Sequence, residues 1–196
     1  TIIGRGWGQG PQHSQNFQSM FGHVPGLKVV MPSTPHDAKG LLMESVYDDN
    51  PVIFIEHRRL YEEVGVVAEE AYREPLGKGV VRRKGTDATI VAFSYMQVEA
   101  KKAATILEKL DIDVEIIDPR TLKPLDEELI IESVGRTGRL VVADLGWRFC
   151  GITAEIAALV TEKVFDQMKA PVCRIALPDV PTPTSSALEA VYYPDY

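Results

Sequence analysis

One histidine follows a glycine-rich stretch, and this combination is the strongest chemical feature of the sequence. Four glycines alternate with other residues between positions 4 and 10, and His13 comes three residues later. Glycine lets a backbone approach a ligand or another chain closely. An imidazole titrates near neutral pH, so it can give or take a proton there. We therefore interpret His13 as a residue to which a substrate or a cofactor is presented.

The spacing of these glycines does not match the common phosphate-binding loops. In the registers that begin at Gly4 and Gly6, the third glycine of a dinucleotide-binding loop would fall on Gln9 or Pro11. The Gly-Lys-Ser/Thr sequence that ends the phosphate-binding loop (P-loop) of nucleoside triphosphatases does not follow these glycines either. From the residues alone, a glycine-rich turn with a surface histidine is therefore an equal alternative.

Pro11 predicts the start of a helix that carries His13. Proline is favoured in the first turn of a helix, because that position needs no amide hydrogen. We expect this helix to continue through residues 17–21, which include three large apolar side chains. His13 would then lie in the first turn, beside the positive end of the helix dipole, which favours the neutral imidazole.

The composition is that of a globular protein without a nucleic-acid or membrane partner. The chain has 196 residues, of which 45% are hydrophobic and 25% charged. A formal net charge of −7 argues against binding to nucleic acid or to an anionic membrane surface. No apolar run approaches the ~20 residues that span a membrane. Cys150 and Cys173 are too few for a disulfide framework, so we expect reduced thiols in the core.

The first part of the chain alternates strands and helices. Residues 1–3, 28–31 and 52–55 are expected strands, and residues 17–21 and 35–46 are expected helices. Continuous apolar runs of this kind are typical of parallel strands covered on both faces. The order predicts part of a doubly wound α/β domain over residues 1–73. Because the chain opens inside an expected strand and without methionine, we interpret it as a fragment or a proteolysed product.

A second α/β domain is expected over residues 74–196. Residues 56–75, which lead into this domain, are charged and have no clear periodicity, and we interpret them as an exposed linker. The expected strands of the second domain are 79–82 (an edge strand), 88–93, 114–117, 140–143 and 172–175, and its helices are 97–110, 125–134, 153–168 and 187–191. Crossovers of this length predict parallel pairing with right-handed connections.

The distribution of histidines places the chemistry in the first domain. All four histidines lie there, and we expect His36 and His57 to be surface or linker residues. Ligands of open parallel sheets bind beyond the carboxyl ends of the strands. In the second domain that edge carries residues 94–95, 118–121 and 144–151, none of which pairs a nucleophile with a base. We therefore expect a packing and docking role for the second domain.

Motifs along the whole chain resemble the β subunit of the E1 component of 2-oxo acid dehydrogenases. The most specific are Gly-Pro-Gln-His-Ser-Gln at residues 10–15 and the run from residue 23 to residue 41. Further similar segments are 51–56, 59–61, 75–78, 117–122, 124–126, 137–139, 151–156 and 178–183. The resemblance implies an α/β fold in which part of a pyrimidine-binding doubly wound domain precedes a transketolase C-terminal-like parallel-sheet domain.

The resemblance also implies an activity and partners. It implies thiamine-diphosphate-dependent oxidative decarboxylation of pyruvate or a branched-chain 2-oxo acid, with acyl transfer to a lipoyl group on the E2 core. The resemblance further implies an α2β2 heterotetramer. In it, the E1 α subunit holds the diphosphate and Mg²⁺, and a second β subunit completes the assembly. The β subunit carries the pyrimidine ring of the cofactor. The implied location is the cytoplasm, or the mitochondrial matrix in a eukaryote.

Individual residues take roles from the same resemblance. His13 matches the active-site histidine that faces the reactive centre of the cofactor. Ser45, Asp48 and Asn50 match the ligands of a structural K⁺, with a plain acidic turn at a helix end as the alternative. Trp7 is expected to pack at a subunit interface or beside the cofactor.

Two segments of the second domain are expected to make contacts. Arg120 is expected either to bridge to a partner chain or to pair locally with Asp118 or Asp126. Trp147 is expected to contact E2 or a second β subunit.

Two departures from the family pattern limit the expected activity. The glutamate that activates the pyrimidine ring, and the aromatic residues that stack on it, precede Thr1 in the family. We therefore expect this chain to be inactive alone. The sequence of residues 144–151 also differs from the commoner family versions. An acetoin-cleaving or other transketolase-like enzyme subunit, and a non-catalytic module for E2 binding or dimerisation, are the alternatives.

Overall fold

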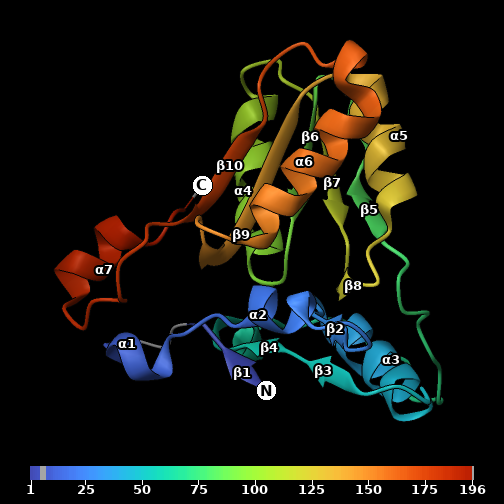
Figure 1. The fold of residues 1–196 in the computed structure, drawn as a ribbon, viewed down its shortest axis with the longest axis vertical. Coiled ribbons are helices and arrows are strands. Elements are labelled where there is room, and N and C mark those ends of the chain that lie inside the picture. The colour runs from blue at the N-terminus through green and yellow to red at the C-terminus, as the bar shows by residue number, and fades with distance from the viewer. Residues whose placement is uncertain (5–7, 196) are drawn as a thin grey trace.

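The structure, a computed structural model, describes residues 1–4 and 8–195. It consists of two α/β units stacked end to end. Figure 1 shows the N-terminal third of the chain in the lower unit and most of the rest around the upper sheet. The carboxyl-terminal helix α7 (Ser186–Tyr192) lies to one side, near α1 (Gly10–His13). The expected α/β fold with two successive units is therefore confirmed.

The upper sheet has five strands and follows the expected topology. Its order is β10 (Cys173–Leu177), β9 (Leu140–Trp147), β6 (Ala88–Ala92), β7 (Val114–Asp118) and β5 (Val80–Arg83). All neighbours are parallel except β5, which pairs antiparallel with β7. The expected edge strand is thus present, and its direction is opposite to that of the other strands.

Helices cover both faces of this sheet because consecutive side chains of a strand point to opposite faces. On β6, Val91 packs in one apolar cluster with side chains of α5 (Glu127–Thr137) and α6 (Ile152–Val164). Ile90 packs on the other face with side chains of α4 (Met96–Glu108). Two short 3₁₀ helices, η1 (Arg58–Glu62) and η2 (Phe165–Gln167), complete the helical elements.

The lower unit is a smaller sheet to which the second half of the chain lends a strand. β2 (Lys28–Val30) pairs parallel with β3 (Val52–Phe54) and antiparallel with β8 (Thr121–Lys123). β4 (Glu56–His57) follows β3 after one residue and pairs parallel with β1 (Ile2–Ile3). The sequence did not indicate β8, because a three-residue strand has almost no periodicity of its own.

Thr34 caps the start of the helix α3 (Pro35–Val46). Its hydroxyl accepts a hydrogen bond from the backbone N–H of Asp37 at 3.1 Å, and Pro35 opens the first turn. The neighbouring Ser33 instead donates its hydroxyl to Asp118 of the other unit. The start of α3 therefore lies at the junction of the two units.

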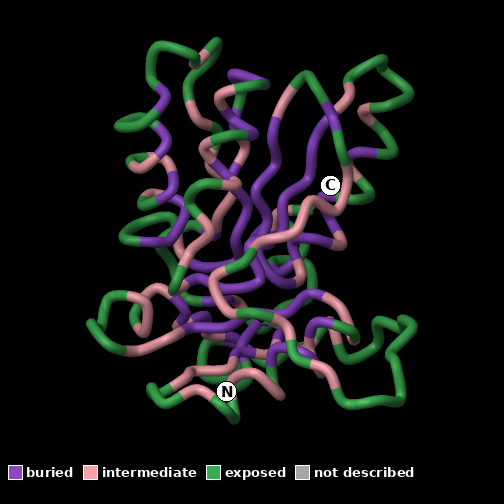
Figure 2. Tube along the Cα trace, turned by 90° about the vertical axis from the view of Figure 1, so that its right-hand side faces the viewer, coloured by how far each residue is buried: buried purple, intermediate pink, exposed green. Residues whose placement is uncertain are grey.

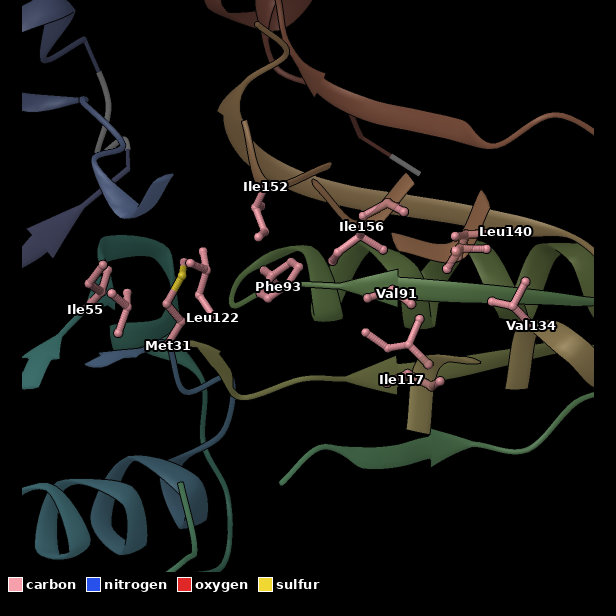
Figure 3. Packing of buried hydrophobic residues seen from close by; sticks show 14 of the residues in the cluster. Met31, Ile55, Val91, Phe93, Ile117, Leu122, Val134, Leu140, Ile152 and Ile156 are labelled. Atoms are coloured by element: carbon pink, nitrogen blue, oxygen red, sulfur yellow. The ribbon is translucent and has the colours of Figure 1, made fainter. Parts of the chain in front are cut away.

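A single apolar cluster crosses this junction. Met31, Ile55 and Leu122 of the lower unit belong to the same cluster as Phe93 and Ile156 of the upper unit. Figure 3 shows Phe93 between the side chains of the lower unit, at the left of the view, and those of the upper unit, at the right. Figure 2 shows buried backbone both in the upper strands and through the junction. The two units are thus held together by shared apolar packing, and the boundary at residues 73 and 74 stays a prediction.

Two expectations from the sequence are wrong at this level. The single helix from Pro11 through residue 21 is two short helices, α1 and α2 (Gln18–His23), separated by residues 14–17. Cys150 and Cys173 are free, but both are exposed and neither lies in the core. Within the described residues, the search for a helix of sufficient length and apolarity to span a membrane finds none.

Candidate functional site

The polar groups suited to chemistry gather where the two units meet. The parallel strands of the upper sheet end at this junction: Trp147 is the last residue of β9, and Tyr95 and Arg120 lie shortly after β6 and β7. The segment that carries His13 follows β1 on the other side. The carboxyl edge of a parallel sheet is the usual position for a ligand site.

His13 is exposed and ends the one-turn helix α1. The expectation that it lies beside the positive end of a helix dipole is therefore wrong, since that end of α1 is at Gly10. The backbone carbonyl of His13 accepts a hydrogen bond from the Arg58 guanidinium at 2.5 Å. The chain thus holds the backbone at this position and leaves the imidazole accessible on the surface of the single chain.

A hollow of about 350 Å³ adjoins the His13 segment. Its walls come from three parts of the chain, namely Pro11 and Gln15, Trp147 at the end of β9, and residues 179–182. The indole N–H of Trp147 donates to the carbonyl of Val180 at 3.3 Å, which fixes the indole against the carboxyl-terminal segment. The expected contact of Trp147 with another chain stays a prediction. Trp7, like Arg5 and Gly6, lies outside the described residues, and its expected packing cannot be assigned to a place.

His57 is buried, which contradicts its expected place in an exposed linker. It is 1% exposed, pairs with Ile3 across β1 and β4, and stacks on the Tyr95 ring with the ring centroids 5.2 Å apart. Its Nδ1 accepts the backbone N–H of Arg59 at 3.2 Å. Gly4 leaves the space for this ring, because a Cβ on Gly4 would lie 2.0 Å from His57 Nε2. His36 is exposed, as expected, and the exposed linker begins only after η1.

Arg120 is buried within this chain and is the centre of an ionic network between the units. Its guanidinium contacts Asp37 Oδ1 at 3.1 Å and Glu74 Oε2 at 2.7 Å. Arg82 contacts Asp118 Oδ2 at 2.8 Å and also pairs with Asp37. The expected local partner Asp118 instead accepts the backbone N–H of Arg120 at 3.0 Å. Arg120 therefore joins the start of α3 to the upper sheet.

The pKa values of two buried carboxyl groups in this network are shifted in opposite directions. Burial tends to raise the pKa of Asp37, but the Thr34 hydroxyl and the guanidinium groups of Arg82 and Arg120 hold it below its usual value. Burial raises the pKa of Asp118, and the nearby Arg82 and Ser33 only partly oppose this effect. Of these two buried groups, Asp37 is therefore the one whose negative charge the network stabilises.

A third buried carboxyl group, that of Asp144, connects the upper sheet to α2. The side-chain amide of Gln18 donates to its two oxygens at 3.0 and 2.9 Å, and the backbone N–H of Gly146 donates at 3.0 Å. Burial raises the pKa of Asp144 to about 6, although these hydrogen bonds act in the other direction. This contact could not be predicted from the sequence, because its two residues are 126 positions apart.

The three candidate K⁺ ligands lie at and beyond the end of α3 and already make contacts within the chain. The Ser45 hydroxyl donates to the carbonyl of Leu41 at 2.7 Å. Asp48 pairs with the ammonium group of Lys28, and its other oxygen accepts two hydrogen bonds of 2.9 Å from Asn50. These contacts lower the pKa of Asp48 to about 2, with the Lys28 hydrogen bond as the main cause. The K⁺ site stays a prediction.

Comparison with known proteins agrees with this architecture. Residues 3–63 match the family "Transketolase, pyrimidine binding domain", and residues 77–196 match "Transketolase, C-terminal domain". A solved structure described as "Split gene transketolase, inactive beta4 tetramer" aligns with a TM-score of 0.71 at 27% identity, over 86% of this chain and 54% of that one.

Curated relatives are similar over nearly the whole chain. The β subunit of acetoin:2,6-dichlorophenolindophenol oxidoreductase from Cupriavidus necator is 45% identical over 99% of this chain and 57% of its own length. The β subunit of the pyruvate dehydrogenase E1 component from Rickettsia felis is 45% identical over 93% of this chain and 56% of its own length. The chain therefore spans a little over half the length of these relatives.

Proposed function

Because the chain belongs to the transketolase family, with that family's pyrimidine-binding and C-terminal domains in succession, we propose that it forms part of the β subunit of a thiamine-diphosphate-dependent 2-oxo acid dehydrogenase E1. The observation that carries this proposal is the similarity of almost the whole chain to β subunits of the pyruvate dehydrogenase E1 component. The exposed position of His13, in a segment whose Pro11 and Gln15 line a hollow with Trp147 and residues 179–182, supports it.

His13 is the proposed catalytic residue of this chain. Bound thiamine diphosphate supplies the electron sink for decarboxylation of a 2-oxo acid. An accessible imidazole at the mouth of a shared site can donate a proton to the substrate or accept one from it. Arg58 holds the backbone carbonyl of His13, which limits where the ring can move.

Other components of the reaction are assigned to partners. We assign the diphosphate and Mg²⁺ to an E1 α subunit, and acyl transfer to a lipoyl group on E2. Among residues 1–4 and 8–195, no group of three His, Cys, Asp or Glu side chains is arranged to hold a metal ion. A second β subunit completes the proposed heterotetramer, in the cytoplasm or in the mitochondrial matrix.

Acetoin cleavage is the second candidate function. The acetoin enzyme subunit and the pyruvate dehydrogenase subunit have the same identity to this chain, 45%. Both reactions break a bond beside a carbonyl carbon, so the same imidazole could serve either. The substrate therefore has to be decided by assay.

The experiment is reconstitution of the full-length subunit that contains this chain with an α subunit. Thiamine-diphosphate-dependent reduction of dichlorophenolindophenol is measured with pyruvate, with branched-chain 2-oxo acids and with acetoin. We expect turnover with one of these substrates, and none from the 196-residue chain alone. Absence of thiamine-dependent turnover with every substrate in the assembled complex would reject the proposal.

Replacing His13 with alanine should lower kcat about a hundredfold, the lower range for loss of a general acid or base. Replacing His23, an exposed histidine at the end of α2, serves as the matched control and should leave kcat unchanged. Both proteins should assemble with α and show the same thermal stability. An equal rate in the two variants would exclude His13 from catalysis.

The proposed K⁺ site predicts that K⁺ stabilises the folded chain, and this can be tested without measuring activity. If K⁺ binds the folded chain near Asp48, KCl should raise Tm above its value in choline chloride at the same ionic strength, because a ligand of the folded state stabilises it. Asn50→Ala should abolish the difference. Equal Tm values in the two salts would instead favour the plain helix-ending turn.

A further inference from the structure

The Gln18–Asp144 contact is a buried bond between the two units, close to the proposed catalytic residue. Gln18 is fully buried at the start of α2, five residues after His13, and Asp144 is 2% exposed on β9. The amide of Gln18 donates to both carboxyl oxygens. A second hydrogen bond of 3.1 Å runs from the backbone N–H of Ile152 to the hydroxyl of Ser19. The segment that follows His13 is thus attached to the upper unit at two adjacent residues, Gln18 to β9 and Ser19 to the start of α6.

The local backbone is built around this carboxyl group. A Cβ on Gly146 would lie 2.6 Å from Asp144 Oδ2 and 3.1 Å from Gln18 Nε2, so any larger residue at position 146 would disturb the pair. Trp147, the next residue, lines the hollow beside His13 together with Pro11. A shift of Gln18 relative to Asp144 would therefore change the walls of that hollow.

We propose that Asp144 is a positioning residue, whose buried carboxyl group holds the His13 segment in place through Gln18. The consequence for catalysis rests on the function proposed above, whereas the attachment itself does not. Asp144 touches neither substrate nor cofactor in this proposal. It acts only through the placement of residues 10–18.

The groups around Asp144 are neutral, which makes the attachment depend on pH. The contacts that influence its pKa are the Gln18 amide on α2 and the backbone N–H groups of Leu145 and Gly146, and no charged side chain of the described residues is among them. A buried carboxylate without a cation is disfavoured relative to the neutral acid. When the segment opens, water hydrates the carboxyl group and its pKa returns to the ordinary value of 3.8.

The direction of the pH effect follows from these two values. Because the pKa is about 6 when the segment is closed and 3.8 when it is open, the closed state binds more protons. Its stabilisation by Asp144 is complete below pH 3.8 and is lost as the pH rises through 6. Linkage then predicts that the equilibrium constant for opening rises about tenfold between pH 5 and pH 7.

Hydrogen exchange of the assembled full-length subunit tests the attachment directly. Protection of residues 10–23 is measured from pH 5 to pH 7 and corrected for the intrinsic exchange rate. We expect the tenfold loss of protection in the unaltered subunit and no pH dependence in Asp144→Asn, which has no titrating group. Asp166→Asn, the same change at an exposed carboxyl group of the upper unit, should behave like the unaltered subunit. The same pH dependence in Asp144→Asn would overturn the proposal.

A kinetic comparison separates positioning from general stability. Asp144→Ala removes the acceptor of the Gln18 amide, so kcat should fall about tenfold, whereas Asp144→Asn retains an acceptor and should restore most of it. If Asp144→Ala does not fold, Gln18→Ala replaces it in the same comparison. Equal kcat in all variants would overturn the positioning role. If exchange behaves as expected in a subunit without thiamine-dependent activity, the proposed function fails and the attachment stands.

Discussion

Replacing Arg120 with alanine should destabilise the chain by about 3–5 kcal/mol, the usual cost of breaking a buried ion pair from one side. The guanidinium group contacts Asp37 and Glu74 and also donates to the carbonyl of Lys78 at 2.9 Å. Asp37 is only 1% exposed, so its charge would lose one of its two cationic partners with little access to water. The free energy of unfolding in urea measures the effect.

A surface pair supplies the control for this measurement. Arg73 contacts Glu44 at 3.3 Å with 55% of its side chain exposed. Its replacement by alanine should cost less than about 1 kcal/mol, because solvent screens an exposed ion pair. If both replacements cost the same, the network around Arg120 does not hold the two units together. An altered dependence on urea concentration would mean that the surface exposed on unfolding has also changed.

Replacing Gly4 with alanine should cost about 2–5 kcal/mol, from two separate causes. The φ angle of Gly4 is +72°, where a residue with a Cβ is strained by about 1–2 kcal/mol. The added Cβ would also lie 2.0 Å from His57 Nε2, and overpacking of this kind costs about 1–3 kcal/mol more. His57 cannot move aside easily, because it is buried against the Tyr95 ring.

Gly26 separates these two causes. Its φ angle is +85°, but a Cβ there would meet no atom within 4 Å. Gly26→Ala should therefore show the cost of backbone strain alone, about 1–2 kcal/mol. In the double variant with His57→Ala, Gly4→Ala should lose the steric part of its effect, so the two changes should not be additive. Additive free energies of unfolding would show that the His57 ring does not occupy the space above Gly4.

The regular part of the second unit could be predicted from the sequence because its signals are local. Apolar runs over residues 88–93 and 114–117 correspond to β6 and β7 within one or two residues. The helix α5 begins after its cap Asp126 and ends before Gly138, which has a left-handed backbone. Both signals lie next to the helix in the sequence. Each of these features depends on neighbours in the chain and not on distant contacts.

The segment around His13 could not be predicted in the same way. Residues 14–17 interrupt the expected helix, and the side-chain amide of Asn16 donates to the carbonyl of Ser14 at 3.4 Å. Such local side-chain bonds compete with helical hydrogen bonds. The backbone N–H of Gly4 also donates to the carbonyl of Gln15 at 3.2 Å, which holds the interruption against the end of β1. The position of His13 at the end of a single turn follows from this arrangement.

The sequence by itself determined the α/β class, the order of most elements and the family resemblance, because periodicity and motifs are properties of neighbouring residues. It also led to the prediction that His13 is catalytic, which stays a prediction. Only the tertiary structure decided that His57 is buried, that β8 completes the lower sheet, and that Asp144 bonds to Gln18. Those three features join residues that are 38 to 126 positions apart. Burial and pairing depend on which distant side chains meet, and a linear pattern carries almost no record of that.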